Sequence, residues 1–274
     1  MQSVLITGGT GFFGQAFTER LLKDGLATRV CIYSRDEHKQ ADMDRRLNDP
    51  RLRFFIGDVR DRHRLTRALE SCDTVIHAAA LKRIETGFYN VSESAKTNIL
   101  GAMNLIEAAK DAKVERVVAL SSDKAYNPIS MYGASKLTSE FLFLGNNVPG
   151  RYPRFAVCRY GNVWKSTGSV VPKWQQMLED GETHVPLTDP ECTRFFMHMH
   201  EAVQLVLDTL EQMPNEPAIP DLPAYRLGDL AEAMGASVIV TGLPRWEKLH
   251  ESMDDNRCSK DAPRMTIDQL RAEL

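Results

Sequence analysis

Residues 3–14 read SVLITGGTGFFG, a short apolar segment followed at once by a glycine-rich turn. The apolar part has the length of a buried strand, and Gly8, Gly11 and Gly14 stand where that strand gives way to a helix. Glycines at this point allow a tight turn, close approach of backbone N–H groups to a pyrophosphate, and close packing of helix on strand. The stretch therefore predicts a dinucleotide-binding turn, with a purely structural turn as the minor alternative.

Further apolar segments alternate with amphipathic ones. The expected strands are 3–7, 29–33, 52–57, 74–78, 116–120 and 154–159, and the expected helices are 16–23, 62–70, 95–109 and 131–144. Continuous apolar strands separated by helices are typical of a parallel sheet covered on both faces. We therefore predict an α/β fold with a Rossmann-type, doubly wound parallel sheet over residues 1–159, against which segment 197–213 packs. Residues 160–274 are expected to form a smaller, mixed substrate-binding region.

Composition limits the classes of partner. The chain has 274 residues, 43% of them hydrophobic, and a formal net charge of -3 without a long run of either sign. This balance does not suggest a nucleic acid or an anionic membrane as partner. Five widely spaced cysteines without a CxxC pair predict neither disulfides nor a zinc site, and no signal peptide or long apolar run is present. We expect a cytoplasmic globular protein with a small-molecule ligand.

The end of the second strand indicates which dinucleotide binds. Ser34 stands where an NAD-binding acid is usual, and Arg35 follows it. A carboxylate would repel a 2′-phosphate, whereas a guanidinium group can hold it through two hydrogen bonds, so the pattern favours NADP. The alternative is a solvated charged turn. Asp58 is placed to accept from the adenine amino group, or otherwise to cap the next helix. The predicted cofactor contacts are Gly8, Thr10, Gly11, Phe12, Gly14, Ser34, Arg35, Asp58, Val59, Ala78, Ala79, Lys82, Tyr132 and Lys136.

The stretch LSSDKAYNPISMYGASK, residues 120–136, concentrates ionisable groups at the carboxyl end of the fifth strand. Tyr132 and Lys136 are four residues apart on one face of a predicted helix, and a nearby ammonium makes a phenol easier to ionise, so Tyr132 is a candidate base. The adjacent acid and lysine exceed what hydride transfer alone requires. They suggest a second event, removal of a proton and expulsion of a hydroxyl, or otherwise an exposed turn. The candidate catalytic residues are Ser122, Asp123, Lys124, Tyr132 and Lys136.

Taken together, these motifs resemble the extended short-chain dehydrogenase/reductases, and within them the soluble inverting UDP-N-acetylglucosamine 4,6-dehydratases. The matching segments are TGGTGFFG, YSRDEHKQ, GDVRD, HAAALKRI, TNILGAMNLIEAA, SSDKAYNPISMYGASK, RYGNVWKSTGSVVP, TRFFMHMHEAVQLV, EKLHESM and MTIDQLRAEL, which span almost the whole chain. The C5 proton of a hexose becomes acidic only after C4 is oxidised. The resemblance implies that Tyr132, supported by Lys136 and Ser122, takes the C4 hydroxyl proton while hydride passes to NADP. Lys124 then removes the C5 proton and Asp123 protonates the departing C6 hydroxyl. Return of the hydride to C6 makes this a lyase reaction.

In the second region, Arg159, Asn162 and Arg194 are predicted to contact the UDP-sugar, because guanidinium groups bind diphosphates and an amide suits a sugar oxygen. Lys82 is expected near both cofactor and substrate. A structural role is the alternative for each. No metal site is predicted, since the two histidines of MHMH (197–200) lack convergent acids.

Some features leave alternatives open. Lys165 and Thr167 stand where the similar family usually has Gly and Arg, and the segment after ESMDD is shortened, all in the region expected to shape the sugar pocket. A 5,6-dehydratase would need the same residues, a 4-epimerase would leave the acid–lysine pair unused, and a silent NADP-binding regulator would not need the complete Ser–Tyr–Lys set. Helices 94–109 and 131–144 are those by which similar enzymes pair, so at least a homodimer is expected.

Overall fold

The computed structural model describes all 274 residues and contains a six-stranded parallel sheet with the order β3-β2-β1-β4-β5-β6. The strands are β1 (Ser3–Thr7), β2 (Arg29–Ser34), β3 (Leu52–Ile56), β4 (Thr74–His77), β5 (Arg116–Leu120) and β6 (Arg154–Cys158). This is the Rossmann order, in which the direction of chain progression reverses between β1 and β4. The predicted fold class is confirmed, and each strand lies within one residue of its predicted bounds.

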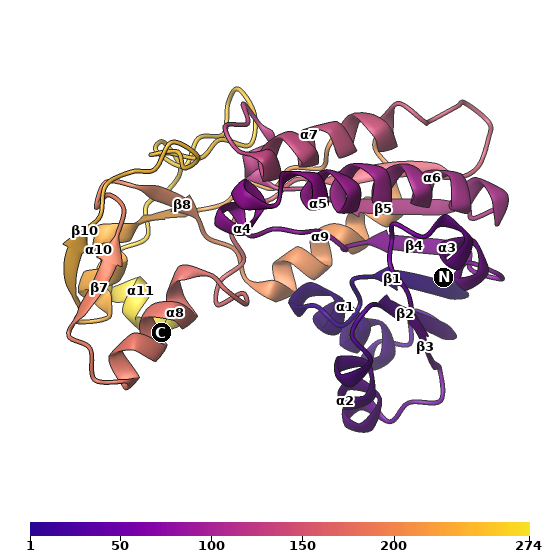
Figure 1. Cartoon of the computed structure of the whole chain (residues 1–274), viewed down its shortest axis with the longest axis horizontal. Coiled ribbons are helices and arrows are strands. Elements are labelled where there is room, and N and C mark those ends of the chain that lie inside the picture. Colours follow the sequence, from indigo (N-terminus) through magenta and orange to yellow (C-terminus); the bar gives the residue numbers. More distant parts are fainter.

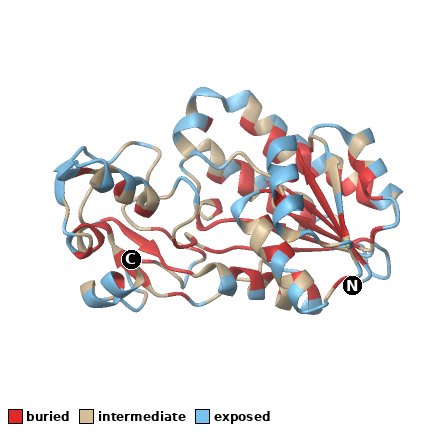
Figure 2. Ribbon diagram, turned by 90° about the horizontal axis from the view of Figure 1, so that it is seen from below, coloured by how far each residue is buried: buried red, intermediate tan, exposed pale blue.

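Helices cover both faces of this sheet (Figure 1). One face carries α1 (Phe12–Lys23) and α9 (Met199–Gln212), and the other carries α3 (Arg62–Ala68), α6 (Gly101–Asp111) and α7 (Met131–Leu144). Alternate side chains of β1 serve different cores: Val4 and Ile6 pack on the α1 side, and Leu5 packs on the α6 side. Figure 2 shows the strands buried between these layers. Because helices cover both faces, the strands are apolar along their length, which explains the continuous apolar segments of the sequence.

Three helical regions differ from the sequence expectation. α1 begins at Phe12 because Gly11 is its N-cap with an extended backbone. The helix expected at 95–109 is instead α5 (Val91–Ala95), a π-helical turn (Lys96–Leu100) and α6. The unexpected helix α2 (Glu37–Leu47) begins after Asp36, whose carboxylate accepts a hydrogen bond from Lys39 N–H (3.0 Å). Part of the charged stretch after β2 is therefore a capped helix and not a free turn.

The remaining elements form a smaller lobe, at the left of Figure 1. They are α8 (Val170–Glu179), β7 (His184–Leu187), β8 (Thr193–Phe195), β9 (Ala224–Arg226), α10 (Leu227–Ala233), β10 (Ser237–Val240) and α11 (Ile267–Glu273). The short helix α4 (Ile84–Tyr89) comes between β4 and α5 in the chain. β7 pairs with β10 in parallel, and β8 pairs with β9 antiparallel. A third core here contains Trp164 and Trp174. None of the helices combines the length and the apolar character needed to traverse a bilayer.

Candidate active site

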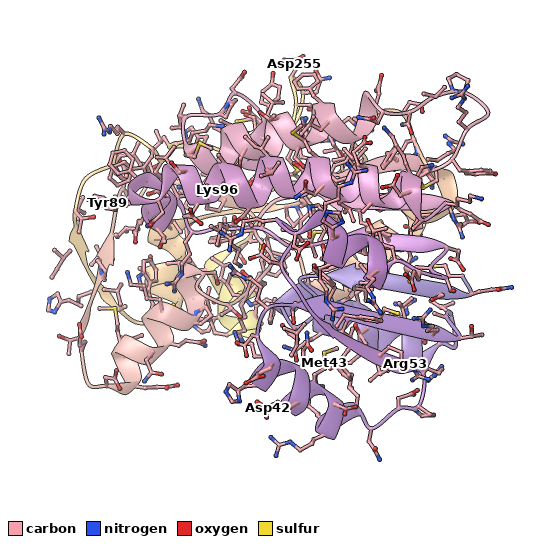
Figure 3. All side chains as sticks on the ribbon, turned by 45° about the vertical axis from the view of Figure 1, so that its right-hand side comes forward. Asp42, Met43, Arg53, Tyr89, Lys96 and Asp255 are labelled. Atoms are coloured by element: carbon pink, nitrogen blue, oxygen red, sulfur yellow. The ribbon has the colours of Figure 1, made fainter.

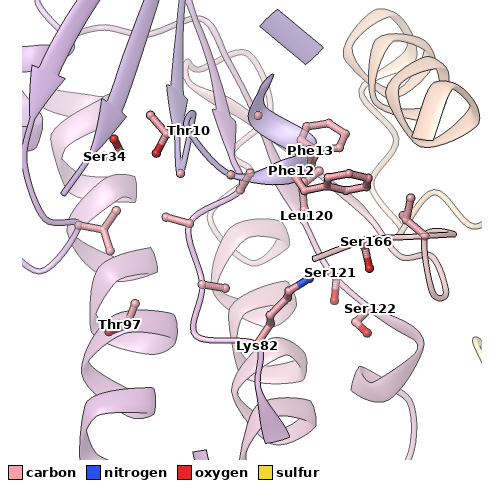
Figure 4. A pocket seen from close by; sticks show the side chains of 18 of the residues that line it. Thr10, Phe12, Phe13, Ser34, Lys82, Thr97, Leu120, Ser121, Ser122 and Ser166 are labelled. Atoms are coloured by element: carbon pink, nitrogen blue, oxygen red, sulfur yellow. The ribbon is translucent and has the colours of Figure 1, made fainter. Parts of the chain in front are cut away.

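A cavity of about 860 Å³ opens at the carboxyl ends of the parallel strands. Open α/β sheets bind ligands at this crevice, where the strand order reverses. Figure 4 shows Thr10 and Phe12 of the glycine turn, Lys82 of the loop after β4, and Ser121 and Ser122 after β5 around one space. The predicted site residues that line it are Gly8, Thr10, Gly11, Phe12, Gly14, Ser34, Arg35, Asp58, Val59, Ala78, Ala79, Lys82, Ser122, Lys124, Tyr132, Lys136 and Asn162.

The glycine turn has the shape of a phosphate cradle because side chains are excluded from it. Gly8 has a φ of +67°, and a Cβ there would lie 2.9 Å from the Ala79 nitrogen. A Cβ at Gly14 would lie 2.6 Å from the Gly9 backbone. Gly11 caps α1 without a side-chain hydrogen bond. The first N–H groups of α1 therefore face the cavity free of side-chain acceptors, at the positive end of the helix dipole.

The far end of the cavity is formed by the residues after β2 and β3. Ser34 Oγ accepts from Gln40 Nε2 (2.9 Å), so the end of β2 is fixed by an amide. The exposed Arg35 lies on the wall, with Nη1 3.9 Å from Asp58 Oδ2. Partial burial acts to raise the pKa of Asp58, but hydrogen bonds from Arg60 and the charge of Arg35 hold that pKa below its usual value. Asp58 is not the helix cap, since Asp61 caps α3.

Tyr132 and Lys136 reach the cavity from the first turns of α7, which begins after its N-cap Ser130. Burial raises the pKa of Tyr132, while the Lys124 cation and the Ser122 hydroxyl act in the opposite direction. Burial lowers the pKa of Lys136 to about 8, against the attraction of nearby Glu140. Tyr132 thus depends on its neighbours to ionise, and Lys136 exchanges its proton close to neutral pH.

Asp123 lies behind the cavity wall and not on it. A 3₁₀ turn (Asp123–Ala125) follows β5, and the Asp123 side chain is fully buried within it. Oδ1 accepts from Ser122 Oγ (2.8 Å) and from Lys124 Nζ (3.1 Å), whereas Oδ2 has no hydrogen-bond partner. Asp123 is therefore connected to the cavity through the Ser122 hydroxyl and the Lys124 ammonium.

Lys124 lies between two carboxylates. Its Nζ is 3.1 Å from Asp123 Oδ1, 3.5 Å from Glu251 Oε1 and 3.3 Å from Asn162 Oδ1. Burial opposes the charge, yet the attraction of Asp123 and Glu251 raises the pKa of Lys124 above its ordinary value. Lys124 is consequently a cation at neutral pH. It can remove a proton only after it has passed its own to an acceptor, and Asp123 Oδ1 is the nearer of its two carboxylates.

Arg159 and Arg194, which the sequence predicted to contact a UDP-sugar, do not line the cavity. Arg159 is buried in an ion pair with Glu140 of α7, and Arg194 is buried against Glu247. Both guanidinium groups also donate to main-chain carbonyls of the segment 247–253. Burial explains these positions, because a guanidinium group taken out of water must be paired. Both arginines fasten a segment of the smaller lobe.

Lys82 and Asn162 do lie on the wall, and their contact with a substrate stays a prediction. The Lys82 side chain extends across the cavity toward Ser121 and Ser166 (Figure 4). Enclosure by the cavity walls, and then the neighbouring cations Arg83 and Lys124, lower the pKa of Lys82. Lys82 thus holds its proton less firmly than a free lysine does.

Lys165, in the loop after Asn162, departs from the glycine usual in the similar family. Its φ of 54° lies in the left-handed region, which glycine adopts without strain. The Lys165 ammonium donates to Leu274 O (2.7 Å). The chain thus keeps the loop conformation with a different residue and gains a contact to its C-terminal helix.

Two supporting residues had no assigned role in the sequence interpretation. Asn98 fixes the loop after β4, since its Oδ1 accepts from Leu81 N–H (2.8 Å) and its Nδ2 donates to Leu81 O (3.0 Å). Glu140 accepts from Ser121 Oγ and from Arg159. The spacing of Lys136 and Glu140, one helical turn apart, was a recognisable signal for an acid beside the lysine. No local signal marks Asn98.

Comparisons with known proteins extend over most of the chain. Residues 4–268 match a family described as polysaccharide biosynthesis protein. A Campylobacter jejuni protein named UDP-N-acetylglucosamine 4,6-dehydratase (inverting) is 45% identical over 257 residues, which are 92% of this chain and 77% of that protein. A Rickettsia bellii protein named UDP-glucose 4-epimerase is 42% identical over 265 residues, with the same two coverages of 92% and 77%. The X-ray structure of Pen from Bacillus thuringiensis has a TM-score of 0.91 at 28% identity and covers 99% of this chain and 96% of its own.

We predict that Arg159→Met lowers the free energy of unfolding by about 3–5 kcal/mol, because it leaves the buried Glu140 carboxylate without its partner. Urea denaturation followed by circular dichroism measures this change. The matched control is Arg151→Met at an exposed position, which should change stability by less than about 0.5 kcal/mol. Equal, small effects of the two substitutions would contradict the structural role of Arg159.

Proposed function

Since this chain belongs to the polysaccharide biosynthesis protein family, we propose that it dehydrates UDP-N-acetylglucosamine to a 4-keto-6-deoxy sugar with inversion at C5. The observation that carries this proposal is the Asp123–Lys124 pair next to Ser122, Tyr132 and Lys136. Oxidation at C4 alone needs a base and its supporting lysine, whereas loss of water needs a further acid and base. Similarity to a protein named as an inverting dehydratase supports the choice of substrate and stereochemistry.

We assign the cofactor to residues 1–159 together with α9, and the sugar to the side of the cavity formed by residues 160–274. The glycine cradle and Arg35 belong to the first part. Asn162 and Ser166 line the cavity from the second part. This division places the catalytic side chains of α7 between the two ligands.

NADP is the dinucleotide that this proposal assigns. The cradle of Gly8, Gly11 and Gly14 leaves room and N–H donors for its diphosphate. At the far end the wall carries Arg35, 3.9 Å from Asp58, and Lys39, 3.7 Å from Asp36, whose other carboxylate oxygen caps α2. The chemistry that NADP would supply when bound is reversible uptake of a hydride, from C4 of the sugar and back to C6. Two cations beside Ser34 suit a 2′-phosphate better than a free ribose hydroxyl.

The first step assigned to the chain's own residues is removal of the C4 hydroxyl proton. Tyr132 takes this proton, because the adjacent Lys124 cation and Ser122 hydroxyl favour its phenolate form. Lys136, on the same helix face one turn later, supplies a positive charge that supports the phenolate. The resulting C4 carbonyl makes the C5 proton acidic, which is why oxidation must precede elimination.

The second step is elimination. Transfer of one proton from Lys124 Nζ to Asp123 Oδ1, 3.1 Å apart, prepares a neutral amine and a carboxylic acid at once. The amine then takes the C5 proton, and the acid provides the proton with which the C6 hydroxyl leaves as water. Ser122 Oγ, 2.8 Å from Asp123 Oδ1 and on the cavity wall, connects this buried acid with the sugar. Reprotonation of C5 from the opposite face gives the inverted product.

A 4-epimerase is the second candidate, favoured by the Rickettsia bellii relative at 42% identity. Epimerisation shares the oxidation at C4 and then returns hydride to the same carbon. It leaves Asp123 and Lys124 without a task, so we prefer dehydration. A 5,6-dehydratase would use the same five side chains and differ in returning hydride to C4, which leaves an exocyclic alkene.

We expect proton NMR of the protein with UDP-N-acetylglucosamine and NADP in deuterated water to show a new methyl group with deuterium at C5 and C6. The C5 coupling should show inversion. Lys124→Met should abolish the methyl signal, since it removes the base but not the cavity. Vinyl signals without a methyl group would identify the 5,6-dehydratase. Conversion to the C4 epimer would identify the epimerase and contradict the proposal.

Arg35→Ala should weaken NADP binding by about 10–100-fold, because it removes a charge-assisted hydrogen bond of about 1.5–3 kcal/mol, and should leave NAD binding unchanged. Fluorescence titration with both reduced dinucleotides measures the two dissociation constants. The control is Arg45→Ala on the exposed side of α2, where Arg45 pairs with Asp42 away from the cavity. Equal losses for both dinucleotides would refute the assignment of NADP.

We also propose that a second copy of the chain packs on the outer face of α6 and α7. These helices lie side by side on one surface (Figure 1). The exposed apolar side chains there include Leu100, Met103 and Phe141, and Phe141 is 71% exposed. Large apolar side chains left exposed on neighbouring helices are candidates for an interaction surface.

Phe141→Glu should shift the protein from dimer to monomer in size-exclusion chromatography with light scattering, because the substitution would bury a charge in the interface. Tyr152→Glu is the matched control, since Tyr152 is 70% exposed but lies on the loop before β6. A wild-type monomer, or dimers from both variants, would refute this interface.

A further inference from the structure

Glu251 is a buried carboxylate that faces the cations Lys124, Lys248 and Arg194 without a short contact to any of them. It is 2% exposed and comes from the segment 247–253 of the smaller lobe. Its Oε1 lies 3.5 Å from Lys124 Nζ, and its Oε2 lies 3.6 Å from Lys248 Nζ without any hydrogen bond. A buried charge is costly unless close ion pairs and hydrogen bonds compensate it, and Glu251 has only the two longer contacts. Glu251 does not line the cavity and has no role in the steps proposed above.

We infer that Glu251 is a positioning residue, which holds the Lys124 amino group in place and stabilises the charge that Lys124 gains on taking the C5 proton. This inference rests on the proposed dehydration and assigns a further residue to it. The chemistry needs such a group because Lys124 alternates between amine and ammonium during the reaction.

The backbone around Glu251 is fixed from both sides. Glu251 N–H donates to Ser259 Oγ (2.9 Å), and Ser259 N–H donates to Glu251 O (2.7 Å). Lys248 Nζ donates to Tyr126 O (2.6 Å), two residues after Lys124. The Tyr126 hydroxyl in turn donates to Asp255, which Figure 3 labels at the upper edge of the molecule. The segment that carries Glu251 is therefore attached directly to the turn that carries Lys124.

The other charges near Lys124 show what Glu251 adds. Asp123 is the nearest carboxylate, while Arg194 and Lys82 are cations that face the same amino group. Four further ionisable groups lie around Lys124 and Glu251: Lys248 and Glu247 of segment 247–253, Tyr132 of α7 and Tyr225 of β9. Without Glu251, Asp123 would be the one carboxylate beside Lys124, because Glu247 is paired with Arg194. An ammonium at Lys124 would then be poorly stabilised.

The elimination can be written with its electrons. The C5–H bond breaks, its proton forms a new N–H bond on Lys124, and its electron pair moves toward the C4 carbonyl oxygen. That pair then forms the C5–C6 double bond while the C6–O bond breaks, and Asp123 gives the proton that makes the leaving group water. Lys124 ends as an ammonium and Asp123 as a carboxylate. A fixed negative charge at Glu251 stabilises the cation as it develops in the transition state.

Glu251→Gln keeps the shape and removes the charge. We expect hydride transfer from C4 to persist, so that NADPH fluorescence accumulates, while elimination slows on the order of 100-fold. A substrate carrying deuterium at C5 should then show a primary isotope effect larger than that of the wild type. The carboxylate that raises the pKa of Lys124 is gone, so the Lys124 ammonium loses its proton at lower pH. The basic limb of the elimination rate should therefore move to lower pH.

Glu191→Gln is the control, because Glu191 also pairs with an arginine, Arg226, but at an exposed position away from the cavity. It should leave the isotope effect and the basic limb unchanged. Glu251→Asp keeps the charge and should retain the wild-type basic limb at a reduced rate, which preserves the test if the Gln variant does not fold. The inference is overturned if the wild type is active but Glu251→Gln slows oxidation and elimination equally and leaves the basic limb at its wild-type pH. If the Gln variant does not fold, a basic limb shifted to lower pH in Glu251→Asp overturns the inference instead. A wild type that forms no deuterated methyl product overturns the proposed function, and this inference with it.

Discussion

The buried ion pair between Arg159 and Glu140 joins the parts of the chain that carry the candidate catalytic residues. Glu140 stands on α7, the helix of the tyrosine and lysine, and also accepts from Ser121 at the end of β5. Arg159 follows β6 and donates to Met253 O in the smaller lobe. One contact therefore fixes a helix, two strands and the segment 247–253 relative to each other. Because both groups are out of water, loss of either would leave the other as an unpaired buried charge.

Two buried lysines show how the same side chain acquires different properties. Lys136 has the single nearby carboxylate of Glu140, and burial lowers the pKa of Lys136 to about 8. Lys124 has Asp123 and Glu251, which together outweigh burial and raise its pKa. The number of carboxylates around each ammonium thus sets how strongly the lysine holds its proton. A site that combines oxidation with elimination can use both kinds.

The sequence predicted what depends on local pattern. Continuous apolar segments identified the parallel strands, the glycine turn identified the cradle, and the spacing of Tyr132 and Lys136 placed both on one helix face. The positions of Arg159 and Arg194 were not predictable in this way, because an arginine in a buried pair and an arginine on a ligand look alike in sequence. No local pattern marks Glu251, since its contact with Lys124 is made between the two lobes, 127 residues apart along the chain.

The third core of the smaller lobe is separate from the two cores of the large sheet. The boundary between the cores falls at the end of β8: Phe195 packs with the large sheet, and the next residue, Phe196, packs in the third core. Such an arrangement favours sub-global opening, in which the outer lobe loses its protection against amide exchange while the sheet stays folded. A ligand that touches both parts would bind only the closed form and so raise the free energy of that opening by linkage. Bound substrate would then make the unfolding of the two lobes more cooperative than it is in the free protein.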